Sequence, residues 1–477
     1  MAHSDPPETL MSAAVLRSLL AAACFVPALP TAWAGGLDDP LDTLSLAPLK
    51  PSPALGGRVT AAPCSSTLPA TPLGVVDVVD LTLCNNAQTR EVWATARAQA
   101  AALGVARSAW LPSLDGKGTV GRQWSDSVGS NERMASLTLS WLLFDFGTRA
   151  ATVENARQLL AAAAASQDAT VQTLFLAALQ SYYAAQAGRA SVDALREAER
   201  VARESFDAAD TRYRVGVATP ADRLQAQTAW SQATLNRIRA EGDLRNALGT
   251  LANVMGFDAQ RPFVLTDIPS LTPDAAFERD MAALVDEARQ RRPDLKAAEA
   301  QVSAARASVD AARAAGLPTV SLAAGPTWQE VGGLSTHGGA VGVTVNVPIF
   351  SGFNTTYKVR AAEAQVEVRE AQRERLEKQV ALDVWKAYQS LSTSSQTLKT
   401  TADLVASAEA SAQVALGRYK AGVGSILDVL NAQSALASAR QQRIQATLDW
   451  NVYRATLAQA MGSLDYGLLQ PAGEGKQ

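Results

Sequence analysis

Histidine and cysteine are scarce in this sequence, whose 477 residues include only two histidines and three cysteines. These residues do not cluster at a spacing that binds a metal ion, and the chain has no phosphate-cradling glycine loop and no nucleophile motif. The sequence therefore predicts no enzymatic activity, no metal site and no cofactor.

Charged and aromatic residues are also sparse. The formal net charge is −3, which provides no basic field for nucleic acid, so nucleic-acid binding is not expected. Aromatic residues make up 6% of the chain and charged residues 19%, and alanine-rich tracts are long. This composition favours helices that pack closely through small side chains over a single thick core.

A long apolar run is missing after the N-terminal region. No stretch of 18 or more apolar residues follows residue 34, so a spanning helix is not expected, and a membrane-inserted form would be a β-barrel. Residues 1–34 are interpreted as a signal peptide, because Arg17 precedes SLLAAACFVPALP and Ala32-Trp33-Ala34 has the small-x-small cleavage pattern. A short buried helix is the alternative. Two acidic residues before Met11 suit a signal peptide poorly, so the start at Met1 and a start at Met11 both stay open.

The three cysteines divide between the signal peptide and the exported chain. Removal of the signal takes away Cys24 and leaves Cys64 and Cys84, a close pair that favours a disulfide after export. Two unpaired buried thiols are the alternative. Cys24, within LLAAAC, faintly resembles a lipid-attachment site, but Ala21 stands where such signals usually have leucine, so acylation is not favoured.

One motif occurs twice in the chain. RYRVGVATPADRLQAQ begins at Arg212 and RYKAGVGSILDVLNAQ begins at Arg418, an offset of 206 residues (418 minus 212). The same offset relates Leu111-Pro112 to Leu317-Pro318, Phe144 to Phe350, Arg237-Ile238 to Arg443-Ile444, and Met255-Gly256 to Met461-Gly462. A single offset across these pairs indicates a tandem duplication.

The duplication divides the chain into six expected parts. These are a signal peptide (1–34), an extended N-terminal segment with the disulfide (35–86), a first repeat (87–256), an equatorial segment (257–292), a second repeat (293–462) and a C-terminal tail (463–477). Each repeat should contain a helix, two strands and a long helical hairpin.

The helices are predicted from composition and from proline and glycine signals. The opening helices should cover about 87–109 and 293–315, each ending before a Leu-Pro pair. Helical tracts then run over about 148–212 and 355–418, and some 65 residues make a rod of roughly 100 Å. An ordinary globular domain does not need helices of that length.

The strands are predicted from period-two alternation. SLTLSWLLF and AVGVTVNVPIF place apolar residues on one face, with weaker partner strands near 113–124 and 318–328. The polar stretches 125–134 and 329–338 are expected to be exposed loops. Strands of this length with one apolar face suit a membrane barrel. Its aromatic girdles would be Trp110, Phe144, Phe146, Phe350 and Phe353 at one end and Trp124 and Trp328 at the other. An ordinary two-sheet core is the alternative.

The repeated motif predicts a tight turn and a new helix. Gly216 and Gly422 permit the positive φ that a turn between antiparallel helices requires. The next helix should begin with a hydroxyl N-cap and an acid at N3, which are Thr219 and Asp222 in the first repeat and Ser425 and Asp428 in the second. Helix capping alone accounts for both aspartates.

The duplicated plan, the strand ends LLFDFG and PIFSGF, and the two turn motifs resemble the TolC-like outer-membrane factor family over essentially the whole mature chain. The resemblance implies an α+β membrane protein. In it, a homotrimer forms a transmembrane β-barrel from four strands per chain, continued by a long periplasmic α-helical tunnel. The segment PCSSTLPATPLGVVDVVDLTLCNNAQTREVW is most similar to members that serve type I secretion of a cyclolysin-type toxin.

The resemblance also implies that the two turns form the closed entrance of the tunnel, where a periplasmic adaptor docks. Three Asp428 carboxylates would form one acidic ring that favours cations. The family's second inward acid falls at Asn431 and its clamp arginine at Gly424, which implies a weaker closed state. Tyr419 and Asp222 stand where neighbouring turns can contact each other.

Two glutamines one helical turn further in are candidate adaptor contacts. Gln227 and Gln433 follow Ala226 and Ala432, whose small side chains allow a partner hairpin to approach closely. Plain helix packing explains them equally well.

The resemblance implies a passive exit channel in the outer membrane of a Gram-negative bacterium, in contact with its lipid and with its helical part in the periplasm. It would conduct a protein from an inner-membrane ABC exporter through a periplasmic adaptor, also called a membrane fusion protein. Two alternatives stay open. One is the duct of a multidrug efflux pump driven by protons, and the other, from a different class, is a soluble periplasmic coiled-coil adaptor.

Overall fold

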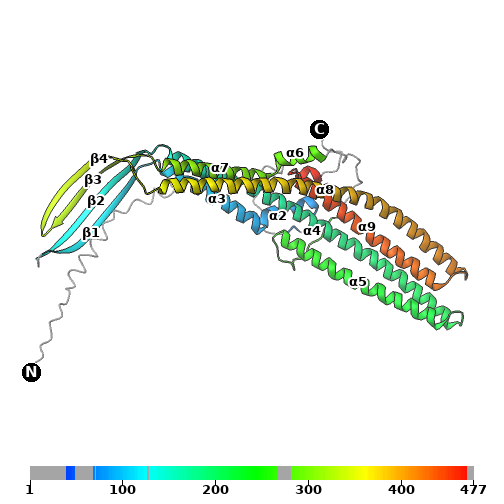
Figure 1. Ribbon diagram of the computed structural model, residues 1–477. Helices are drawn as coiled ribbons and strands as arrows, with labels where there is room; N and C mark the ends of the chain where they lie inside the picture. Colours follow the sequence, from blue (N-terminus) through cyan, green and yellow to red (C-terminus); the bar gives the residue numbers. More distant parts are fainter. Residues whose placement is uncertain (1–38, 49–67, 70, 126–127, 267–280, 470–477) are drawn as a thin grey trace, which may run out of the picture.

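A computed structural model describes residues 39–48, 68–69, 71–125, 128–266 and 281–469. The predicted signal peptide, Cys24 and Cys64 lie outside these residues, as does most of the predicted C-terminal tail. The described chain is an elongated body, with a β-sheet at one end and two helical hairpins at the other (Figure 1).

Each half of the chain contributes a helix, two strands and a long helical hairpin, which confirms the predicted order of elements. The first half contains α3 (Ala87–Ser108), β1 (Ser113–Ser125), β2 (Val128–Phe144), α4 (Thr148–Arg214) and α5 (Pro220–Val254). The second half contains α7 (Pro293–Ala314), β3 (Thr319–Val331), β4 (Leu334–Asn346), α8 (Asn354–Lys420) and α9 (Ile426–Ala460). Shorter elements are α2 (Val75–Asn85), α6 (Met281–Arg291) and the 3-10 helices η2 (Leu44–Leu46) and η5 (Tyr466–Leu469).

The long helices agree closely with the sequence prediction. Helices α4 and α8 each have 67 residues, which corresponds to about 100 Å of α-helix. Proline occupies the first helical position of α5 and α7, where its missing N–H costs no helical hydrogen bond. Among the described helices, none combines the length and the apolar character that crossing a membrane requires.

The four strands form one antiparallel sheet in the order β1-β2-β3-β4. The expectation of exposed loops over 125–134 and 329–338 is wrong. Strand β2 already begins at Val128, and β3 and β4 are joined by only two residues, Gly332 and Gly333, with φ of 59° and 89°. Two consecutive residues with positive φ close a two-residue hairpin turn, so the polar residues around them continue the strands.

The buried core lies in the middle of the body, where short helices cover the long ones (Figure 1). One cluster joins α2, α4, α5 and α9 around Phe175, Tyr182 and Met255. A second cluster joins α6, α8 and α9 around Val384 and Trp450. Cys84 on α2 is disulfide-bonded. Because Cys64 is outside the described residues, its pairing with Cys84 stays a prediction.

Candidate functional site

The two turns at the far end of the helical hairpins have the same backbone geometry. Gly216 follows α4 with φ of 81°, and Gly422 follows α8 with φ of 78°. In each turn the glycine N–H and the next N–H bond back to carbonyls of the last helical turn, as Val217 N does to Arg212 O at 3.0 Å. This pattern is a Schellman motif, which requires the left-handed conformation that glycine adopts without strain.

Each turn is followed by a complete capping box. The Asp222 backbone N–H donates to Thr219 Oγ1 at 3.2 Å, while Asp222 Oδ2 accepts from the Thr219 backbone N–H at 3.0 Å. The second turn repeats the arrangement between Ser425 and Asp428, at 3.1 and 3.3 Å. The predicted N-caps are confirmed, and both carboxylates lie at the positive ends of helix dipoles.

The two turns of one chain pack against each other through a small apolar cluster. Its buried members come from all four helices and are Ala209, Ala226, Tyr419, Ile426 and Val429. The Arg212 guanidinium carbon lies 4.2 Å from the centre of the Tyr419 ring, and Arg212 Nη2 donates to Tyr419 O at 3.0 Å. One arginine of the first turn therefore binds both the ring and the terminal carbonyl region of α8.

The other predicted residues of this region lie as follows. Asp428, Asn431 and Gln227 are exposed, whereas Gln433 is half-buried and exchanges hydrogen bonds with Ser205 of α4 at 3.0 and 3.3 Å. Within the described chain, Gln433 therefore has a helix-packing role. Tyr419 is 8% exposed and is held by Arg212 of its own chain, so its contact with a neighbouring chain stays a prediction.

A tightly packed glycine occupies the position where the family resemblance places a clamp arginine. A Cβ atom at Gly424 would lie 3.1 Å from both Arg418 Cβ and Tyr419 N, which is closer than most side chains approach. The sequence reasoning missed Arg212 and Ser205. Arg212 opens the repeated motif, so its position was a signal, but its partner on the other turn is fixed only by packing between helices that are distant in sequence.

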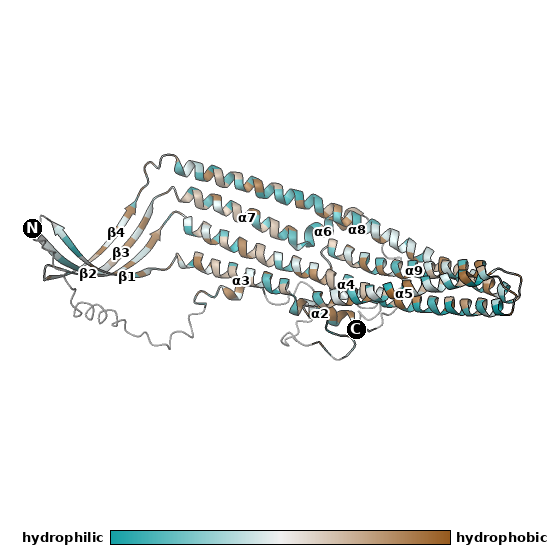
Figure 2. Cartoon of the chain, turned by 90° about the horizontal axis from the view of Figure 1, so that it is seen from below, coloured by the Kyte–Doolittle hydropathy of each residue, from teal (hydrophilic) through white to brown (hydrophobic). Residues whose placement is uncertain are grey.

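The opposite end of the body has a sheet with two chemically different faces. Paired residues share a face, and one face carries the rows Trp141–Leu322–Val343 and Leu139–Ala324–Val341. We call this the apolar face. The neighbouring residues point to the other face, which carries Ser140–Ala323–Gly342 and Thr138 with Asp115, and we call it the polar face. In Figure 2 the hairpin ends of the strands are coloured hydrophilic.

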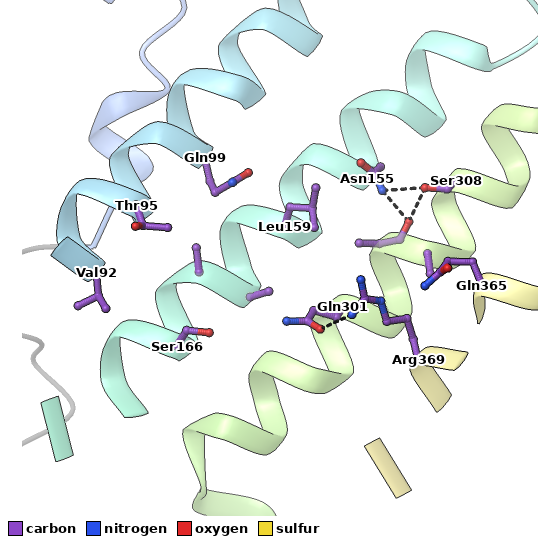
Figure 3. A pocket seen from close by; sticks show the side chains of 14 residues that line it. Val92, Thr95, Gln99, Asn155, Leu159, Ser166, Gln301, Ser308, Gln365 and Arg369 are labelled. Atoms are coloured by element: carbon purple, nitrogen blue, oxygen red, sulfur yellow. Dashed lines mark hydrogen bonds between the residues drawn. The ribbon is translucent and has the colours of Figure 1, made fainter. Parts of the chain in front are cut away.

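A cavity of about 400 Å³ lies between α3, α4, α7 and α8 (Figure 3). Asn155 Nδ2 donates to Ala304 O at 2.7 Å and to Ser308 Oγ at 2.9 Å, and Arg369 Nη1 donates to Gln301 Oε1 at 3.3 Å. These contacts tie neighbouring helices together. The described residues contain no group of histidine, cysteine, aspartate and glutamate side chains that could hold a metal ion.

A solved structure shares this architecture. The crystal structure of the CmeC outer membrane channel of Campylobacter jejuni matches with a TM-score of 0.74, over 86% of this chain and 92% of that chain, at 18% identity. The chain therefore shares its fold with that outer-membrane channel.

The family follows from the sequence comparison. The family model described as Outer membrane efflux protein matches residues 78–257 and 284–463, well over half of the chain, and its two matches start 206 residues apart (284 minus 78). The chain belongs to this family of passive channels. The alternative of a soluble coiled-coil adaptor is set aside on these grounds.

Two curated relatives are similar over most of their length. Protein CyaE of Bordetella pertussis (strain Tohama I) is 32% identical over 401 residues, which cover 82% of this chain and 84% of the relative. The alkaline protease secretion protein AprF of Pseudomonas aeruginosa is 26% identical over 414 residues, which cover 82% of this chain and 85% of the relative.

Proposed function

We propose that three copies of this chain form the exit channel of a type I secretion system, which conducts a protein across the outer membrane. The observation that supports a channel is the structure of the four-stranded sheet. Strands β1 and β4 are its two edges, and one face is apolar while the other is polar. A four-stranded sheet is too narrow to close on itself, so three copies would pair edge to edge with the apolar faces toward lipid.

Two further observations support the remaining parts of the assembly. Helices of about 100 Å below the sheet suit a periplasmic tunnel. The two family matches, separated by the same offset as the sequence motif, support an origin by tandem duplication.

The cargo is proposed to be a protein. This follows from the similarity to CyaE over 82% of the chain and from the name of AprF, which is a protease secretion protein. A toxin of the cyclolysin type is the specific cargo that we propose. The rival function is the duct of a drug-efflux pump, which the efflux description of the family favours.

The channel itself would spend no energy. An inner-membrane ABC exporter would hydrolyse ATP, and a periplasmic adaptor would contact residues 212–227 and 418–433 and spread the turns apart. Three exposed Asp428 carboxylates would line the entrance and attract cations.

Single-channel recording in planar lipid bilayers tests the channel and its entrance. We expect a cation-selective pore, and Asp428→Ala should reduce the cation preference, whereas Asp428→Glu keeps the charge and should preserve it. Unchanged cation selectivity of Asp428→Ala would show that the Asp428 carboxylates do not form a selective ring. Absence of any pore would show that the chain does not form a channel.

Cross-linking in native membranes tests the partners. A cysteine at Ser425, or at exposed Leu427, which leaves the cap intact, should capture an adaptor together with an ABC exporter, identified by mass spectrometry. Capture of an adaptor with a proton-driven pump would favour the efflux function. Capture of neither would show that the turns are not the docking surface.

A further inference from the structure

The apolar face changes its chemistry toward the hairpin turns of the sheet. Beyond the row of Leu139, Ala324 and Val341, the same face carries Trp328 beside His337. The next row pairs Arg133 with Glu330. The row after that pairs Arg122 with Asn131. Charged side chains therefore stand on the same face as the apolar rows, next to their far edge.

The two arginines are diagonal neighbours on adjacent strands. Val120 is the partner of Arg133, and Asn131 is the partner of Arg122, so both arginines point to one face and are two positions apart. Both are exposed, and Arg133 retains 59% of its side-chain surface. Such a pair can bind one anionic group from two sides.

The pair is only partly neutralised by its surroundings. Arg133 Nη1 lies 3.7 Å from a Glu330 carboxylate oxygen, a long contact between exposed groups. Arg122 has no carboxylate partner among the described residues, and its guanidinium carbon lies 5.7 Å from the centre of the Trp124 ring. Two arginines and one glutamate leave a net positive charge on this patch.

A glycine opposite Trp124 leaves room for the Arg122 side chain. A Cβ atom at Gly129 would lie 3.1 Å from Arg122 Nε and 3.2 Å from Arg122 Nη2. The absence of a side chain at Gly129 therefore lets the Arg122 guanidinium lie against this position while the side chain stays exposed.

The depth of the arginines in the membrane follows from strand geometry. From Val345 to Ser335, which shares a row with Glu330, β4 spans ten positions (345 minus 335), or about 33 Å at the usual rise. A tilt of about 40° reduces this to about 25 Å along the membrane normal, the usual height of the apolar band. Because the helices lie in the periplasm, the arginine row is at the outer surface of the membrane.

We propose that Arg122 and Arg133 form a binding site, one per chain, for the phosphate groups of lipid A, the phosphorylated glycolipid of the outer leaflet. The inference rests on the proposed barrel with its apolar face toward lipid. Guanidinium groups bind phosphate with two parallel hydrogen bonds, that is, as bidentate donors. On the side of the arginines toward the helices, the apolar face continues and can contact acyl chains. At the 206-residue offset their counterparts are Trp328 and Gly339, so only the first hairpin carries the site.

The test counts lipids bound to the full chain. Purified trimers are placed in phosphatidylcholine nanodiscs that contain a small fraction of bisphosphorylated lipid A, and retained lipid A is measured by native mass spectrometry. The double variant Arg122→Gln/Arg133→Gln should bind lipid A about tenfold more weakly or worse, since two charge-assisted contacts are removed. Glu330→Gln frees Arg133 and should increase retention.

Lys117→Gln is the matched control, because Lys117 is exposed on β1 but its partner Ser136 places it on the polar face. Retention should be unchanged. Equal retention by the double variant and the unmodified chain would overturn the site, as would equal retention of phosphatidylglycerol and lipid A. Loss of lipid A binding in Lys117→Gln alone would show that the polar face, and not the apolar face, contacts the lipid. The conductance of each variant in a lipid bilayer shows separately whether its channel has formed.

Discussion

The two helical turns at the candidate entrance have the same backbone conformation, but different side chains stabilise them. In the first hairpin, Arg223 Nε donates to Asp210 Oδ1 at 2.6 Å, and Arg214 adds a second contact at 2.7 Å. At the 206-residue offset the counterparts of Asp210 and Arg223 are Leu416 and Val429, which belong to the apolar cluster. The turn geometry is therefore the same in both hairpins where the backbone requires it, while the facing pair differs.

The two junctions between the sheet and a long helix also have different side chains. In the first repeat, buried Arg149 binds Asp145 at 3.2 Å, donates to the carbonyls of Ala109 and Leu142, and lies 4.2 Å from the centre of the Trp110 ring. The counterparts of these residues in the second repeat are small: Ser351 for Asp145, Thr355 for Arg149 and Gly316 for Trp110. The first junction is held by the buried ion pair of Arg149 and Asp145. The second is held by close packing of the Thr355 methyl group against Gly316.

The largest expected effect is at the first junction. Asp145→Ala leaves the Arg149 guanidinium buried without its carboxylate, which should lower the free energy of unfolding by about 3 to 5 kcal/mol. Ser351→Ala, at the matching position, is exposed and should change stability little. Denaturant unfolding of the detergent-solubilised protein, followed by circular dichroism, measures both. Equal losses for the two variants would contradict the asymmetry between the junctions.

The turn glycines should give equal losses in both repeats. Gly216→Ala and Gly422→Ala force alanine to a φ near 80°, at a cost of about 1 to 2 kcal/mol each. Gly417→Ala is the control. Gly417 lies inside α8, and a Cβ atom there would meet no atom within 4 Å, so alanine should stabilise the helix by about 0.5 to 1 kcal/mol. Unequal losses at Gly216 and Gly422 would show that the turns are not equivalent.

Substitutions at the helix caps should cause the next smaller loss of stability, of similar size in the two repeats. Thr219→Ala and Ser425→Ala each remove the capping hydrogen bond and should cost about 1 kcal/mol. Thr219→Ala also removes the contact from Thr219 Oγ1 to Asp222 Oδ2 at 2.9 Å. Exchanging the two hydroxyl residues, as Thr219→Ser and Ser425→Thr, keeps the bond and should cost far less. The same unfolding measurement distinguishes the four variants, and a costless Ser425→Ala would exclude capping as the role of that residue.

The sequence predicted most of the fold because its signals are local. Glycine at the turns, hydroxyl caps and proline at helix starts act within a few residues of one another, so Gly216, Thr219 and Pro220 could be assigned without any partner. The strand extent was predicted less well. Polar residues around 125–134 looked like a loop, because polarity marks solvent contact and does not distinguish an exposed strand from a turn.

The candidate site was predicted in its parts but not in its contacts. The capping aspartates were found, because their partners are three residues away. The contact of Arg212 with Tyr419 and that of Ser205 with Gln433 join residues more than 200 positions apart. No local pattern specifies such pairs, since they depend on how the two hairpins lie side by side.

The smallest expected effect is on pH dependence, and it is confined to the first hairpin. The hydrogen bond from Arg223 holds the pKa of Asp210 below its usual value of 3.8. Because the folded pKa is lowered, the pair stabilises the hairpin above pH 3.8, and the contribution is lost as the pH falls through the folded pKa.

Hydrogen exchange, corrected for the intrinsic rate at each pH, can resolve this difference. On acidification below pH 3.8, amide protection around 207–226 should fall more than protection around 413–432, where Leu416 and Val429 do not titrate. The double variant Asp210→Leu/Arg223→Val gives the first hairpin the apolar pair of the second. If the ion pair is the cause, this exchange abolishes the difference, and a difference that persists in the double variant would assign the pH response to another group.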